Sequence, residues 1–235
     1  GLDSESGPDA GRQVGTREAP GMTRDLLVGD GKSLYLRGRK VFVDISSEEK
    51  KPLLRPVAGF LDGSWFNRVS QWKYGQSSCG EAAITADALV FSFSAYSKRG
   101  TDAGFFEPGS GTYQLSASET NIDDAVDRKG KKQGVQETLE QKWARGIPVA
   151  ARAMLHAGAT VVVGGSPDVV DRADPWKMIE GRGGGRLVMV SAANGKILAE
   201  FPLESPPVLD GMAAARGRLF VALQSGKLVC LESTK

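Results

Sequence analysis

Short runs of alternating apolar and polar residues recur along the chain, each just after a small or turn-forming residue. The four clearest runs are Gly31-Lys-Ser-Leu-Tyr-Leu, Asp87-Ala-Leu-Val-Phe-Ser-Phe, Gly158-Ala-Thr-Val-Val-Val and Gly217-Arg-Leu-Phe-Val-Ala. Period-two alternation with β-branched and aromatic side chains is typical of β-strands. The starts of the runs are 56, 71 and 59 residues apart. This spacing predicts a repeated all-β unit with long insertions between strands.

We expect antiparallel strands in segments 32–44, 86–96, 158–164, 186–201 and 216–232, with short helical pieces only near 135–142 and 175–180. Asn194-Gly195 separates two apolar runs and predicts a hairpin with a type I′ turn, in which both central residues have positive φ. A second hairpin is predicted at Ser225-Gly226-Lys227. Because Gly-Lys precedes the returning strand in both, we expect the two turns at equivalent points of two repeats.

Two segments break this pattern. Residues 1–22 contain almost no large apolar side chains and are predicted to be a leader or linker. Residues 119–142 are rich in charges of both signs with little apolar periodicity, which predicts a solvated insertion.

Composition and charge narrow the function classes. The chain has 30 glycines among 235 residues, and such an excess without a collagen period fits many tight turns between short strands. The net charge of +2 gives no electrostatic case for binding nucleic acid or an anionic membrane. No apolar run approaches the roughly 20 residues of a membrane helix, so no membrane insertion is expected.

The segment Gly185-Arg-Leu-Val-Met-Val-Ser-Ala-Ala-Asn-Gly-Lys-Ile-Leu-Ala-Glu-Phe-Pro resembles the repeat of pyrroloquinoline-quinone-like (quinoprotein-type) β-propellers. That repeat reads as an apolar strand, Ala-x-Asp-x-x-Thr-Gly-Lys, a second apolar strand and a tryptophan. Residues 205–231 are similar to the closing blade of large bacterial proteins of this class. The resemblance is strongest over 145–232 and extends to 25–75.

This resemblance implies a complete or partial β-propeller of four-stranded antiparallel blades, with about four units over 23–235. It also implies that the chain is the C-terminal portion of a larger bacterial polypeptide in the periplasm or outside the cell. The expected partners are upstream blades of the same polypeptide or an associated chain, with a protein or glycan as ligand.

The chain departs from the repeat at the positions nearest its turn. Ala192 and Asn194 replace the aspartate and threonine, and Ala199 and Glu200 stand where the inter-blade tryptophan is expected. Such departures are ordinary in members without bound quinone. We therefore expect a non-catalytic binding or scaffolding module without cofactor. The alternative is a propeller-bearing oxidoreductase or carbohydrate-active enzyme whose reactive groups lie on loops or in a missing part.

Three carboxylates form the most metal-like cluster, in a loop bounded by prolines. Asp168, Asp171 and Asp174 offer hard oxygen ligands of the kind calcium prefers. The run lacks the Asp-x-Asp-x-Asp-Gly alternation of a calcium loop. The alternative is turn and cap chemistry, in which each aspartate bonds to nearby backbone.

An aromatic cluster offers a candidate ligand or partner surface, formed by Asp62, Trp65, Arg68 and Trp72. Aromatic rings beside charged groups stack on sugars or hold peptides. The alternative is packing between blades, which large aromatic side chains also serve.

The sequence offers little reactive chemistry. His156 is the only histidine, which excludes a metal site built from several histidines, and we expect it to have a structural role. Cys79 and Cys230 are either two unrelated thiols or one disulfide. Cys230 lies in an apolar strand and is expected in the core.

Overall fold

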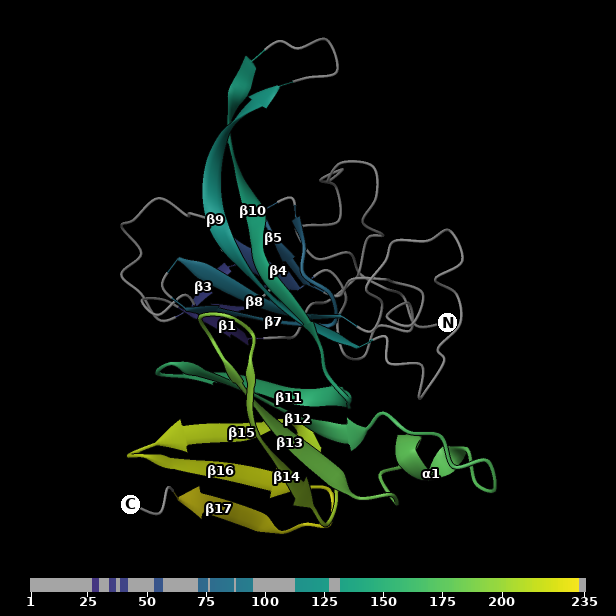
Figure 1. Ribbon diagram of the computed structural model, residues 1–235. Helices are drawn as coiled ribbons and strands as arrows, with labels where there is room; N and C mark the ends of the chain where they lie inside the picture. Colours follow the sequence, from purple (N-terminus) through teal and green to yellow (C-terminus); the bar gives the residue numbers. More distant parts are fainter. Residues whose placement is uncertain are drawn as a thin grey trace, which may run out of the picture.

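The computed structural model describes residues 27–29, 34–36, 39–41, 53–56, 72–75, 77–86, 88–94, 113–126 and 132–232. In these residues the chain is all-β, with one short helix, α1 (Trp176–Ile179), near the predicted 175–180 (Figure 1). No helix in the described part of the chain is long and apolar enough to cross a membrane. The predicted leader, 1–22, lies outside the described residues.

The strands pair with their neighbours in chain order into five antiparallel sheets. Two three-stranded sheets come first, made of β1 (Leu27–Gly29), β2 (Leu34–Leu36) and β3 (Arg39–Val41), and of β4 (Leu54–Pro56), β5 (Trp72–Tyr74) and β6 (Ser77–Ser78).

Three larger sheets follow. The β7–β10 sheet contains β7 (Ala82–Ala86), β8 (Leu89–Ser94), β9 (Gln114–Val126) and β10 (Lys132–Gly146). The β11–β14 sheet contains β11 (Val149–Ala157), β12 (Thr160–Pro167), β13 (Gly185–Ser191) and β14 (Ile197–Leu203). The β15–β17 sheet contains β15 (Pro207–Ala215), β16 (Arg218–Leu223) and β17 (Leu228–Glu232).

In four of these sheets the recurring apolar run of the sequence lies at the same position. Each run leads into the second strand of its sheet, namely β2, β8, β12 and β16. The predicted strands at 86–96, 158–164, 186–201 and 216–232 are confirmed, and β2 and β3 lie within 32–44. The periodic pattern therefore marks a structural repeat.

The larger sheets stack face to face in the order in which the chain forms them (Figure 1). Between the β7–β10 and β11–β14 sheets, Phe91, Phe93 and Leu115 pack in one core with Val161 and Val188. A second core joins the β11–β14 and β15–β17 sheets. Its buried members are Val162, Leu187, Val221 and Leu223.

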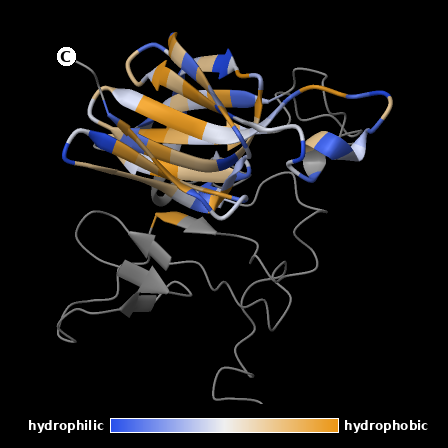
Figure 2. Cartoon of the chain, turned by 90° about the horizontal axis from the view of Figure 1, so that it is seen from below, coloured by the Kyte–Doolittle hydropathy of each residue, from blue (hydrophilic) through white to orange (hydrophobic). Residues whose placement is uncertain are grey.

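The middle sheet is buried on both faces because successive residues of a strand point to opposite sides. On β12, Val161 and Val163 pack toward the β7–β10 sheet, whereas Val162 packs toward the β15–β17 sheet. This arrangement explains why β12 is a continuous apolar run. In Figure 2 the hydrophobic colour likewise lies mainly along the stacked strands.

A further core lies on the other face of the β7–β10 sheet. Leu54 and Tyr74 of the β4–β6 sheet pack there with Cys79, Ala83 and Val90. Three successive sheet pairs therefore share apolar cores.

The predicted helix near 135–142 is wrong, because this segment belongs to strand β10. β9 and β10 form a long hairpin that projects from the stack (Figure 1). β8 pairs with β9 only over residues 114–119, so the outer part of the hairpin pairs with itself alone. The charges are partly matched across the strands, since Lys142 forms an ion pair with Glu119. Beyond Glu119 the two strands of the hairpin therefore pair only with each other among the described strands.

The predicted type I′ turn at Asn194-Gly195 is also wrong. Only Gly195 has positive φ, at 71°, and the Asn194 side chain instead accepts a hydrogen bond from the Lys196 amide. The signature of a type I′ turn, positive φ at both central residues, occurs at Arg216 (51°) and Gly217 (74°) between β15 and β16.

The two Gly-Lys turns are not equivalent, contrary to the prediction. The turn at 193–196 joins the third and fourth strands of its sheet, whereas the turn at 225–227 joins the second and third. A two-residue motif carries too little information to fix the position of a turn within a sheet.

Candidate functional site

The chain leaves the stack between β12 and β13 in an excursion over residues 168–184, which contains α1 and all three aspartates of the predicted metal cluster (Figure 1). Pro175 is the N-cap residue of α1 and makes no side-chain capping bond. A four-residue helix stabilises itself little, so side-chain contacts must contribute to the shape of the excursion.

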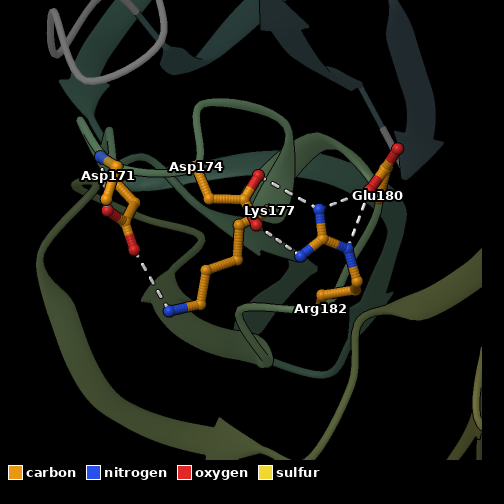
Figure 3. A network of polar contacts seen from close by, with 6 residues as sticks. Asp171, Asp174, Lys177, Glu180 and Arg182 are labelled. Carbon is orange, nitrogen blue, oxygen red and sulfur yellow. Dashed lines mark hydrogen bonds and ion pairs between the residues drawn. The ribbon is translucent and has the colours of Figure 1, made fainter.

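Asp171 bonds to the excursion's own backbone and to a lysine. Its Oδ1 accepts from the Ala173 amide (3.0 Å) and its Oδ2 lies 3.2 Å from Lys177 Nζ (Figure 3). The Ala173 bond and then Lys177 hold the pKa of the Asp171 carboxyl below its ordinary value. Asp171 therefore stays ionised as part of a turn.

Asp174 faces a different cation. The Arg182 guanidinium donates to both Asp174 carboxylate oxygens and also contacts Glu180 (Figure 3). Arg182 lowers the pKa of the Asp174 carboxyl, and the two carboxylates raise the pKa of Arg182. The planar guanidinium suits such two-point contact with a carboxylate.

The predicted calcium site gains no support from these contacts. Asp171 and Asp174 are directed at separate cations, and the described residues bring no three histidine, cysteine, aspartate or glutamate side chains together as a metal would need. Asp168 begins the same excursion and makes a backbone bond to Pro148. The bonds of Asp171 correspond to the turn-chemistry alternative.

An open pocket of about 570 Å³ lies under the excursion. Three cationic side chains line it, Arg172, Lys177 and Arg186, with Asp171 as the one carboxylate of the lining. Val169, Val170 and Met178 add apolar surface. Asp171 is ion-paired with Lys177, so the lining presents mainly cationic and apolar side chains.

The aromatic cluster is only partly visible in the structure. Asp62, Trp65 and Arg68 lie outside the described residues. Trp72 begins β5, is half-buried and packs against the core formed by Leu54, Tyr74 and Cys79. Trp72 is therefore placed as a packing residue and not as part of an exposed ligand surface.

One contact between two sheets was not predicted from the sequence. Trp143 on β10 donates its indole N–H to the Ala192 carbonyl of the next sheet (3.0 Å). A Cβ on Gly195 would lie 2.6 Å from the Trp143 ring, so glycine lets the turn approach the indole. The repeat motif predicts an inter-blade tryptophan at positions 199–200, which lie on β14. The indole comes instead from the preceding sheet, and Trp143 follows directly after the charged segment 119–142.

His156 and Cys79 lie among core contacts. His156 stacks on Phe91 across two sheets, with ring centroids 5.3 Å apart, as its predicted structural role would require. Both cysteines are free, and burial raises the pKa of the Cys79 thiol. Cys230 is exposed, so its predicted place in the core is wrong. It lies on the face of β17 turned away from the stack, which no described sheet covers.

Compared with known proteins, the chain matches no family model and none of the curated proteins. The resemblance to quinone-type propeller repeats therefore depends on the motif residues quoted above.

Proposed function

We propose that the chain is a non-catalytic β-propeller module of the pyrroloquinoline-quinone-like type, acting as a binding or scaffolding part of a larger extracytoplasmic protein. The observation that carries the proposal is the stacking of successive antiparallel sheets, in chain order, through apolar cores. Blades of a propeller are four-stranded sheets packed in this way. The β7–β10 and β11–β14 sheets have four strands each.

The contact between Trp143 and the β13–β14 turn supports the same proposal. A tryptophan that docks between blades is part of the repeat that the sequence resembles, and here an indole from one sheet contacts the Gly195 turn of the next. Hydrogen bonding and close packing together fix the relative position of two sheets more tightly than apolar contact alone.

The exposed face of the last sheet supports the proposed partners, namely further blades from upstream sequence or an associated chain. Phe220 and Cys230 are cross-strand partners on that face, and Leu228 on the same face is 70% exposed. The corresponding face of the β11–β14 sheet, which carries Val162 and Leu187, is buried by its neighbour. The same face carries the Arg218–Glu232 ion pair, so its exposed apolar part is the area around Leu228 and Cys230. Exposed apolar surface is typical of a face that another protein surface covers.

A cofactor titration tests the absence of quinone chemistry. Because Ala192 and Asn194 replace the repeat's aspartate and threonine, we expect no change in visible absorbance when pyrroloquinoline quinone and calcium are added to the chain. Dye-linked alcohol oxidation should also be absent. A quinone-dependent dehydrogenase measured in parallel serves as the positive control. Saturable absorbance changes at micromolar quinone would contradict the proposal and favour the oxidoreductase alternative.

A further inference from the structure

The side chains that line the pocket under the excursion are rich in hydrogen-bond donors and poor in acceptors. The charged ones are three cations, Arg172, Lys177 and Arg186, and one carboxylate, Asp171. Arginine and lysine side chains donate hydrogen bonds and accept none. Asp171 already accepts from the Ala173 amide and pairs with Lys177. The lining therefore suits a ligand group that is negatively charged and only accepts hydrogen bonds, as a carboxylate is.

The cations of the lining keep donors for such a group. Lys177 contacts Asp171, and Arg186 contacts Glu200 through one guanidinium nitrogen at 3.3 Å, so both retain further N–H donors. Arg172 is exposed and forms no ion pair with any residue that the structure describes. Its planar guanidinium can therefore take a carboxylate at two points.

Other acidic side chains of the excursion are held by its own cations. Arg182 contacts both Asp174 and Glu180, as Lys177 contacts Asp171 (Figure 3). Contacts of this kind fix the shape of the excursion before a ligand arrives. Such preorganisation lowers the entropic cost of binding.

An apolar surface adjoins the cations. Val169 and Val170 line the pocket although they are 51% and 46% exposed, and they directly precede Asp171 and Arg172 in the sequence. Trp176 on α1 is a further exposed apolar side chain of the excursion, which stands beside the stacked sheets (Figure 1). Large apolar side chains exposed so close together are typical of an interaction surface.

We propose that this pocket binds an acidic segment of a partner polypeptide, in which a carboxylate contacts Arg172 and a neighbouring apolar side chain packs on Val169 and Val170. The inference rests on the proposed function in treating the chain as a binding module, and it names the kind of partner that the module binds.

The openness of the pocket favours a polypeptide over a small molecule. Pockets for small ligands enclose most of the ligand surface, whereas this pocket is open and its two valines stay about half exposed. A peptide can continue over the rim in both directions. A glycan fits the lining less well, because sugar hydroxyls donate as well as accept hydrogen bonds and the one carboxylate of the lining is already paired.

The test begins with a library of random dodecapeptides displayed on phage and selected on the immobilised full chain. We expect the enriched peptides to carry aspartate or glutamate next to aliphatic residues. One enriched peptide is then synthesised with a fluorescent label, and its dissociation constant is measured by anisotropy. Thermal melts verify that each receptor variant is folded.

Two matched pairs of receptor variants locate the contact. Arg172→Ala should weaken binding by at least about tenfold, as loss of a charge-assisted hydrogen bond implies. Lys196→Ala removes the same charge at the opposite end of β13 and should leave binding unchanged. Val170→Thr should weaken binding several-fold because it places a hydroxyl in the apolar contact, whereas Val208→Thr, at another exposed valine, should not.

A charge exchange separates direct contact from an effect on folding. Arg172→Glu should abolish binding of the acidic peptide, and a peptide with lysine in place of its acidic residue should bind this variant better than the wild-type chain. A merely structural role of Arg172 would not reverse the preference for charge.

Four outcomes would overturn the proposal. The first two are enrichment of no acidic, apolar peptides and equal binding by Arg172→Ala and Lys196→Ala. The third is a dimer of the wild-type chain that is lost in Arg172→Glu, which assigns the pocket to a second copy. The fourth is binding of heparin that depends on Arg172 while no peptide is enriched, which assigns it to a glycan. Because none of these assays involves quinone, their failure is distinguishable from failure of the proposed function in the cofactor titration.

Discussion

Trp143 and Gly195 join two sheets at a single point, although 51 residues separate them along the chain. The indole N–H bonds to the Ala192 carbonyl, and the ring occupies the space where a side chain at position 195 would begin. Gly195 has φ of 71°, which also favours glycine. Position 195 is therefore subject to two constraints, one from its own backbone and one from the neighbouring sheet.

A pair of glycine substitutions separates these two constraints. Gly195→Ala should reduce the free energy of unfolding more than Gly226→Ala, because both have positive φ but only Gly195 has a neighbour within 4 Å of the added Cβ. We expect a difference of about 1–3 kcal/mol, the usual range for overpacking, measured by urea denaturation. Equal losses in the two variants would show that the indole does not restrict position 195.

The limits of residue-level prediction are visible at the same place. Asn194-Gly195 correctly predicted a turn between two strands, because local alternation on both sides is visible in the sequence. The type of turn was wrong, since the Asn194 side chain bonds to the Lys196 amide instead of leaving Asn194 in the left-handed region. Trp143 was missed because its partner lies in another sheet, and contacts of that kind leave no periodic signal.

At the scale of elements, strands that contribute to a core were predictable and the β9–β10 hairpin was not. β12 and β16 carry apolar runs because their sheets bury them. Beyond Glu119, β9 and β10 pair only with each other among the described strands, and their sequence shows little apolar alternation. The aspartate cluster was likewise visible in sequence, but the cations that bind it could only be assigned from the positions of Lys177 and Arg182.

Shortening this hairpin tests its independence from the stack. Replacing residues 122–137 by Asn-Gly joins the paired residues Asn121 and Thr138 through a two-residue turn. We expect the melting temperature to change by no more than about 4 °C, the shift that roughly 1 kcal/mol gives in a domain of this size. The control is Leu139→Ala, which keeps the hairpin but removes a side chain packed on a core and should lower the melting temperature more. A larger loss on shortening than in the control would assign the outer hairpin a structural role.

At the scale of the whole molecule, the sheets differ in how completely they are covered. The β11–β14 sheet is buried by a neighbour on each face, whereas no sheet in the described part of the chain covers the outer face of the β15–β17 sheet. The described sheets therefore form a stack, and the account predicts that protection decreases from its middle toward β17.

Amide hydrogen exchange, resolved by segment on the full chain, tests this stack most directly. The account predicts that amides of β12 and β13 exchange slowest, because opening them exposes two apolar cores at once, and that β17 and the outer hairpin exchange much faster. Exchange of β12 and β13 as fast as that of β17 would contradict the stacked arrangement on which the proposed function depends.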